Sequence, residues 1–149
     1  MLNRDFSDML SAFAGENVEY LVVGAYALAV HGVPRATGDL DFWVRPTGDN
    51  AARVLRALAT FGAPAGDITI DDLTTPDLVF QIGVEPGRID ILTSIDGLTF
   101  DEALETRVIA RIGDLDVPVL GRDALIRNKR AVGRPKDLAD VAQLESGGR

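Results

Sequence analysis

The 149-residue sequence contains no cysteine. This absence excludes a disulfide framework, a zinc site built from thiolates and a cysteine nucleophile. It also fits a cytoplasmic location, which we expect for this chain. Histidine is nearly absent, because His31 is the only one. A structural role for His31 at a helix end is favoured over a role as a proton carrier, since the helix dipole stabilises a cation there.

Long hydrophobic runs are also lacking, and no apolar stretch approaches the roughly 18 residues that a membrane-spanning helix needs. The opening segment, Met1 to Asp8, includes acids and has no apolar signal core. We therefore expect no membrane contact. The content of 46% hydrophobic and 26% charged residues is typical of a globular chain, and the length favours a single domain over residues 1–149.

Basic residues are in the minority, which gives a formal net charge of −8. Such a charge argues against broad, non-specific binding to nucleic acid. The basic residues are nevertheless clustered, since six of the 15 fall within a short stretch near the C-terminus: Arg122, Arg127, Lys129, Arg130, Arg134 and Lys136. A local basic surface is therefore expected despite the overall sign.

The spacing of apolar residues predicts an α/β fold, with a mixed sheet that carries acids on one edge and is flanked by helices. We expect strands over 18–23, 40–44, 68–70, 78–84, 88–92, 108–112 and 117–120. Helices are expected over 6–13, 25–30, 51–61, 100–104, 122–132 and 135–144, with Asp49 or Asn50 capping the third. Turn chemistry marks 85–87, the C-terminal helices span about 122–145, and 146–149 should fray.

Two carboxylates stand two residues apart in the strand-like segment Gly38–Val44. Alternation along a strand places Asp39, Asp41 and Trp43 on one face, opposite Leu40, Phe42 and Val44. Adjacent carboxylates repel each other, so a cation between them is expected, although a solvated pair is the commoner use of Asp-x-Asp. Trp43 could stack on a base or, more commonly for tryptophan, pack on a helix.

A third acid, Asp90, lies in the β-branched segment Arg88–Leu92. One interpretation is an ion pair between Arg88 and Asp90 on an exposed face. The other places this strand beside that of Asp39, so that three carboxylates converge. Such a cluster can hold two hard cations that clamp phosphates, with Asp90 positioned as a general base.

A glycine follows the first predicted strand, in the run Leu21–Leu28. Gly24 lets a helix start sharply and leaves its first amides free, which suits an anion such as phosphate. Many glycines simply turn the chain, so this signal is weak when taken alone.

Taken jointly, these pieces resemble the nucleotidyltransferase superfamily, whose fold is shared with polymerase β. The matching order is Val23-Gly24-Ala25, Asp39-Leu40-Asp41 and Ile89-Asp90-Ile91. The fuller run through His31-Gly32 and Arg35-Ala36-Thr37 is similar to small bacterial nucleotidyltransferases, including abortive-infection and toxin–antitoxin types. The closing runs 125–129 and 134–140 resemble their last helices, so the resemblance covers about positions 18–144.

The resemblance implies that Asp39 and Asp41 bind metal, that Asp90 completes the site, and that the Gly24 turn cradles a nucleoside triphosphate such as ATP. The metal would be Mg²⁺, as two ions, or Mn²⁺. Ala25 departs from the family, which usually has Gly or Ser there, so a hydroxyl is missing while the backbone amides remain.

Three more residues are placed at the nucleotide by the same resemblance: Arg35, Thr37 and Lys129. Their ordinary alternatives are a solvated loop arginine, a threonine that starts a strand and an exposed helix cation. Lys136, Asp137 and Asp140 are interpreted instead as charges in the first turn of a helix.

The function implied is transfer of a nucleoside monophosphate from a nucleoside triphosphate to a hydroxyl, with release of pyrophosphate. The acceptor could be RNA, a protein or a small molecule. The alternative is a non-catalytic protein that keeps the fold and binds nucleotide or a cognate toxin or antitoxin. Three converging carboxylates argue against that alternative, because burying them is costly and binding alone does not need them.

Overall fold

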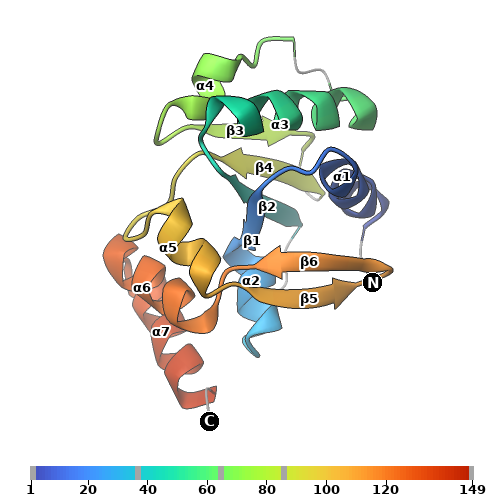
Figure 1. Cartoon of the computed structure of the whole chain (residues 1–149). Coiled ribbons are helices and arrows are strands. Elements are labelled where there is room, and N and C mark those ends of the chain that lie inside the picture. Colours follow the sequence, from blue (N-terminus) through green and yellow to red (C-terminus); the bar gives the residue numbers. More distant parts are fainter. Residues whose placement is uncertain (1–2, 36–37, 64–65, 85–86, 148–149) are drawn as a thin grey trace.

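The computed structural model describes residues 3–35, 38–63, 66–84 and 87–147, which form seven helices and one six-stranded sheet (Figure 1). Along the chain the elements are α1 (Arg4–Gly15), β1 (Tyr20–Val23), α2 (Gly24–Val30), β2 (Asp39–Val44), α3 (Gly48–Phe61), α4 (Ile70–Thr74), β3 (Val79–Ile82), β4 (Arg88–Leu92), α5 (Phe100–Glu105), β5 (Val108–Ile112), β6 (Leu115–Val119), α6 (Arg122–Val132) and α7 (Pro135–Gly147). No helix within these ranges has both the length and the apolar character that crossing a bilayer requires.

The sheet is mixed, with strand order β3-β4-β2-β1-β6-β5. Strand β1 pairs antiparallel with β2 and parallel with β6, while β2 and β4 are parallel. Two antiparallel hairpins, β3–β4 and β5–β6, complete the sheet. The predicted α/β class is therefore confirmed. The acids, however, lie on the interior strands β2 and β4 rather than on a sheet edge, because each strand is flanked by a further paired strand.

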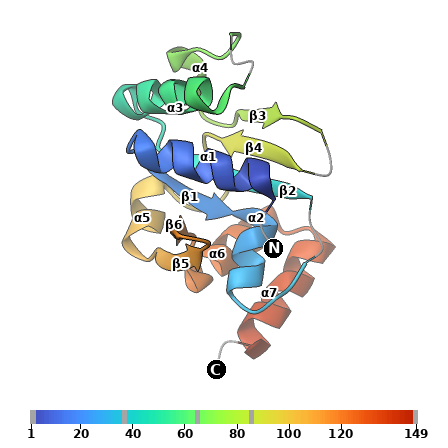
Figure 2. The same cartoon turned by 90° about the vertical axis from the view of Figure 1, so that its right-hand side faces the viewer.

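Helices cover both faces of the sheet, as the strand alternation in β2 requires. On one face Phe42 meets Phe13 of α1, with ring centroids 4.6 Å apart. On the other face Trp43 meets Phe100 of α5, with centroids 5.2 Å apart. Figure 1 shows α1 on one side of β2 and α5 and α6 on the other, and Figure 2 shows α1 beside α3, with which it is in contact. Trp43 therefore packs on a helix, as tryptophan commonly does.

Strand directions bring four chain segments to one end of the sheet. Register pairs Val23, the last residue of β1, with Asp41 near the start of β2. The parallel partner β6 ends beside β1, since Val119 pairs with Val22. Helices α2 and α6 follow these two strands directly, so both begin at the end where β2 and β4 also begin.

Three local expectations were wrong. Residues 68–70 are not a strand, because Thr69 and Asp72 form a reciprocal capping box that starts α4 at Ile70. Thr47 rather than Asp49 or Asn50 caps α3, where its hydroxyl accepts from the Asn50 amide. Residues 146 and 147 of the expected frayed tail are helical instead, since α7 continues to Gly147. Residues 85–86 of the expected turn and residues 148–149 lie outside the described ranges.

Asn50 is fully buried and ties the start of α3 to the backbone around β1 and β2. Its Oδ1 accepts from the Glu19 amide at 2.7 Å. Its Nδ2 donates to the carbonyl oxygens of Glu19 and Arg45 at 2.9 and 3.0 Å. The Asn50 side chain thus forms hydrogen bonds with three backbone groups, which lie next to the start of β1 and the end of β2.

We predict that Asn50→Ala lowers the free energy of unfolding by about 2–4 kcal/mol, because it leaves buried backbone groups without partners. Urea denaturation monitored by circular dichroism measures this loss. Thr47→Ala is the matched control on the same helix, and losing its cap should cost about 1 kcal/mol. A loss in Asn50→Ala no larger than that in Thr47→Ala contradicts the assignment.

Candidate active site

Four ionisable side chains form a square across β2 and β4. In the register Asp39 lies opposite Arg88, and Asp41 lies opposite Asp90. Because alternate residues of a strand share a face, the four side chains project from the same side of the sheet. We call these four residues the carboxylate square. Ile89 and Ile91 project from the other side and are buried in the core.

Arg88 provides the counter-charge inside the square. Its Nη2 donates to Asp39 Oδ2 at 2.9 Å and to Asp90 Oδ2 at 3.2 Å. Its Nε donates to Asp90 Oδ1 at 2.9 Å. Both sequence interpretations of Asp90 are thus realised together, since it pairs with Arg88 and also converges with Asp39 and Asp41. The face is not an exposed one, because Asp90 is only 8% exposed.

Burial and the neighbouring acids oppose the ionisation of Asp41. Burial raises the pKa of Asp41 to about 7, and the nearby charge and hydrogen bond of Asp90 and the charge of Asp39 act in the same direction. Arg88 lowers the pKa of Asp41 but does not reverse the shift. A carboxyl group held this way favours any further cation that can approach it.

Gly24 is required where β1 passes into α2. Its φ of +69° is in the left-handed region, and a Cβ atom at this position would overlap Asp41 Oδ2. The N-cap of α2 is Val23, whose apolar side chain cannot accept a hydrogen bond from the first helical amides. The backbone of the turn therefore comes directly against the Asp41 carboxylate, and its free amides are suited to an anion.

A pocket of about 410 Å³ opens beside this turn and contains most of the residues predicted to contact nucleotide. Gly24, Ala25, Arg35, Asp41 and Lys129 line it, together with Leu28, Arg134, Lys136 and Asp140. Thr37 lies outside the described residues, so its predicted role stays a prediction. The pocket thus joins the glycine turn and one acid of the square to a group of cations from the C-terminal helices.

The role predicted for two acids in this region was incomplete. Asp137 and Asp140 are buried, at 0% and 2% exposure, rather than simple charges of a first helical turn. Asp137 accepts from Arg134 Nε at 2.6 Å and from Lys129 Nζ at 3.4 Å. Asp140 pairs with Lys129 at 3.2 Å and with Arg35. The two carboxylates therefore orient the cations that line the pocket.

The protonation of these groups reflects the network. Hydrogen bonding to Arg134, aided by Lys129, lowers the pKa of Asp137 to about 2. Burial lowers the pKa of Lys129, although Asp137 opposes that shift. A signal for the buried acids was present in the sequence, because Asp137 and Asp140 share the helical spacing of the buried residues Val141 and Leu144.

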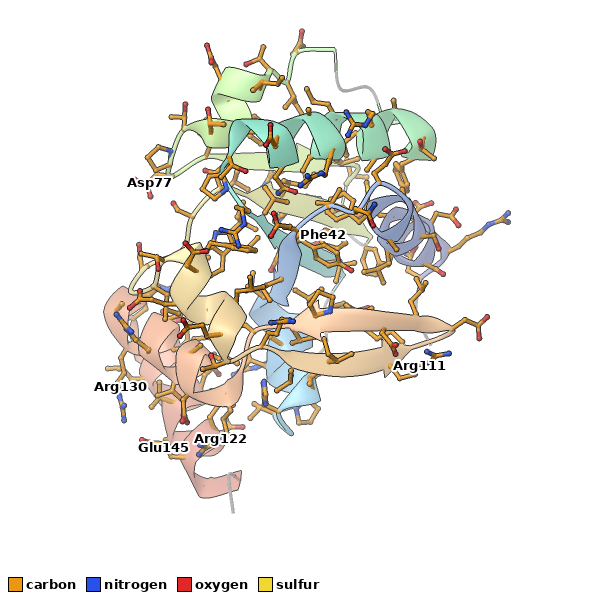
Figure 3. All side chains as sticks on the ribbon, in the orientation of Figure 1. Phe42, Asp77, Arg111, Arg122, Arg130 and Glu145 are labelled. Carbon is orange, nitrogen blue, oxygen red and sulfur yellow. The ribbon has the colours of Figure 1, made fainter. Side chains whose placement is uncertain are left out.

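The basic stretch of 122–136 divides into two surfaces. Lys129, Arg134 and Lys136 line the pocket described above. Arg122, Arg127 and Arg130 line a separate hollow with Asp123 and Glu145, and each is paired with an acid. Figure 3 shows Arg122, Arg130 and Glu145 together on the outer side of the two C-terminal helices. The expected basic surface is therefore largely neutralised on that side.

The carboxylates of the square match a metal ion in ligand type but not in their present arrangement. Three carboxylates on adjacent strands are the ligand type that Mg²⁺ prefers. Within the described ranges, no group of three or more His, Asp or Glu side chains is already arranged to hold a metal ion, which agrees with the position of Arg88 between Asp39 and Asp90. The donor set therefore fits a hard cation chemically, while the space between two of the donors is taken by a guanidinium.

His31 has a structural position, as expected. Its Nε2 is 2.8 Å from the carbonyl oxygen of Leu120, which links the end of α2 to the end of β6. It is absent from the residues that line the pocket.

No known protein family and no curated protein matches the sequence. Solved structures do match the fold. A proposed nucleotidyltransferase from Thermotoga maritima has a TM-score of 0.62 at 15% identity, over 96% of this chain and 88% of that one. ANT(2″)-Ia, crystallised with adenylyl-2″-tobramycin, has a TM-score of 0.57 at 15% identity, over 93% of this chain and 84% of that one. The chain therefore has the nucleotidyltransferase fold, as its motifs predicted.

We predict that Asp41→Asn stabilises the metal-free protein increasingly as pH rises from 5 to 8. The folded pKa of about 7 exceeds the ordinary aspartate pKa of 3.8, so the folded wild type holds a proton that the unfolded chain has lost. Its stability therefore falls as pH rises through this interval, whereas a neutral asparagine is unaffected. The gap should grow by about 2–4 kcal/mol, measured by urea denaturation with chelator present.

Asp116→Asn is the control, since Asp116 is an exposed acid paired with Arg111 on the β5–β6 hairpin. Its stability difference from wild type should stay constant over the same pH interval. A constant difference for Asp41→Asn as well would show that Asp41 ionises normally.

Proposed function

We propose that the protein is a metal-dependent nucleotidyltransferase. It transfers a nucleoside monophosphate from a nucleoside triphosphate to a hydroxyl acceptor and releases pyrophosphate. The observation that carries this proposal is the single pocket in which Asp41 meets the Gly24–Ala25 backbone and the cations Arg35 and Lys129. Acids for a hard cation beside amides and cations for phosphate are what such a reaction requires.

In this proposal each part of the site has a separate role. Asp39, Asp41 and Asp90 hold Mg²⁺ or Mn²⁺, which when bound supplies Lewis-acid stabilisation of the developing phosphate charge. The backbone of Gly24 and Ala25 faces the triphosphate. Lys129 and Arg35, oriented by Asp137 and Asp140, neutralise the phosphate oxygens. Lys136 and Arg134 extend the same cationic wall.

The chemical step needs one proton acceptor. The acceptor hydroxyl attacks the α-phosphorus, its proton passes to a carboxylate, and the bond to the β-phosphate oxygen breaks so that pyrophosphate leaves. Asp90 fits the role of general base because it lies on the strand beside Asp41 and is largely buried. Ala25 contributes only its backbone at the position where the resembling enzymes usually have glycine or serine.

The charge distribution of the protein bears on which class of acceptor the site would use. The neighbour ANT(2″)-Ia is associated by its bound compound with adenylylation of tobramycin, a small molecule. Pairing of Arg122, Arg127 and Arg130 with acids removes the main cationic surface that an RNA acceptor would use outside the pocket. A small molecule or a protein hydroxyl is therefore favoured over RNA.

We predict that Asp41→Ala reduces nucleotide transfer to the level of a protein-free control, because the acid nearest the glycine turn is lost. The assay incubates labelled nucleoside triphosphates and Mg²⁺ with total RNA, candidate proteins and aminoglycosides, and follows pyrophosphate release. Asp123→Ala, an exposed acid on α6, is the matched control and should keep wild-type activity. Retained transfer in Asp41→Ala would sink the proposal.

The same assay distinguishes the proposed enzyme from a non-catalytic protein that only binds nucleotide. A binding protein that keeps the fold would take up nucleotide without releasing pyrophosphate against any acceptor. Calorimetry with nucleotide and Mg²⁺ would register binding under either function, so pyrophosphate is the decisive product.

We predict that Lys129→Met raises the KM for nucleoside triphosphate by about 10- to 100-fold, since one charge-assisted contact to phosphate contributes about 1.5–3 kcal/mol. Lys129 is mostly buried between Asp137 and Asp140, so the variant's thermal stability must be recorded alongside. Arg130→Met, on the outer side of the same helix, is the control (Figure 3). An unchanged KM in a folded Lys129→Met protein contradicts the role.

A further inference from the structure

Arg88 occupies a corner of the carboxylate square that the proposed reaction does not use. Its one Nη2 atom donates to Asp39 Oδ2 on β2 and to Asp90 Oδ2 on β4, at 2.9 and 3.2 Å. The guanidinium thus places a positive charge between one carboxylate oxygen of each strand, where a cation held by both acids would compete with it.

The surroundings make this pairing strong. The side chains of Arg88, Asp39 and Asp90 are 24%, 21% and 12% exposed, so water screens their charges only partly. Three acids and one arginine give the square a formal charge of −2 when every carboxylate is ionised, and removing Arg88 would leave three acids in close proximity. An arginine or a metal ion at this position offsets that repulsion.

Arginine and metal would compete at these carboxylates. An ion held by Asp39 and Asp90 would draw on the carboxylate oxygens that now accept from Nη2, and its charge would also repel the guanidinium. Arg88 cannot lose its proton to relieve this, since a guanidinium stays charged in proteins. Metal binding is therefore expected to work against the contacts that Arg88 makes with Asp39 and Asp90.

We propose that Arg88 is a built-in competitor of the metal, which holds the square together in the metal-free protein and sets the metal concentration at which the site loads. The inference rests on the proposed function, because it concerns the same carboxylates. It adds a regulatory property: the protein should load its metal only above a threshold that this side chain defines.

The test measures metal affinity directly. Isothermal titration of the metal-free protein with Mn²⁺ alone is carried out on wild type, Arg88→Met and Arg111→Met. Arg88→Met should bind Mn²⁺ at least tenfold more tightly than wild type. Arg111→Met removes an exposed arginine that is likewise paired with an aspartate, at the far end of the β5–β6 hairpin (Figure 3), and should match wild type.

Thermal unfolding supplies an independent readout. Without metal, Arg88→Met should melt below wild type, because the carboxylates have lost their counter-ion. Saturating Mn²⁺ should close that gap, so the variant gains more from metal than wild type does. If Arg88→Met does not fold, Arg88→Lys serves instead, since lysine keeps the charge but loses the fork that contacts both acids. It should bind Mn²⁺ more tightly than wild type.

The outcomes separate this inference from the proposed function. Equal or weaker Mn²⁺ binding in the folded Arg88 variant, with wild-type binding that Asp41→Ala abolishes, overturns the competitor role and leaves the metal site intact. Absence of Mn²⁺ binding in wild type and variant alike overturns both. Tighter binding in the variant, lost again in Arg88→Met combined with Asp41→Ala, supports both.

Discussion

The structure of this end of the sheet depends on like charges being packed side by side on two parallel strands. Asp41 and Asp90 are register partners, and Asp39 lies one step along on the same face. Side chains in adjacent strands are about 5 Å apart, so repulsion cannot be relieved by moving one strand without breaking the ladder. Arg88 compensates in part, while burial and the neighbouring acids still raise the pKa of Asp41. A positive partner therefore stabilises the ionised form of the site.

The sheet topology explains why the remaining parts of the site lie beside these acids. Parallel pairing of β1 with β6 makes two helices begin at the same end, and antiparallel pairing of β1 with β2 brings Gly24 against Asp41. The glycine is therefore fixed by two independent requirements, a left-handed φ and the absence of a Cβ atom. The far end of the strands serves the core instead, where Trp43 and Phe100 pack together and Asn50 fixes the backbone.

Much of this could be predicted from sequence, because the deciding patterns were local. The alternation in 39–44 and 88–92 placed the acids correctly on one face, and the glycine after β1 marked the turn. The pairing partner of each strand was not local information, so the acids were assigned to an edge although β2 and β4 are interior. The strand expected over 68–70 failed because the capping chemistry of Thr69 and Asp72 outweighed the β-branched residues beside it. Asp137 and Asp140 were undervalued because their charge suggested solvent, while their spacing matched the buried stripe of α7.

The division of the pocket between early and late parts of the chain has a consequence for its biosynthesis. The glycine turn and all three acids of the square are present once residue 90 has been made, and their resident cation, Arg88, precedes Asp90 by two residues. Lys129, which is proposed to neutralise phosphate, and the acids that orient it lie in residues 129–140. A nascent chain that ends at residue 90 therefore carries the acids with part of their counter-charge but lacks Lys129, Asp137 and Asp140. Under the proposed function, the ribosome-bound protein would stay inactive until α7 has emerged and docked.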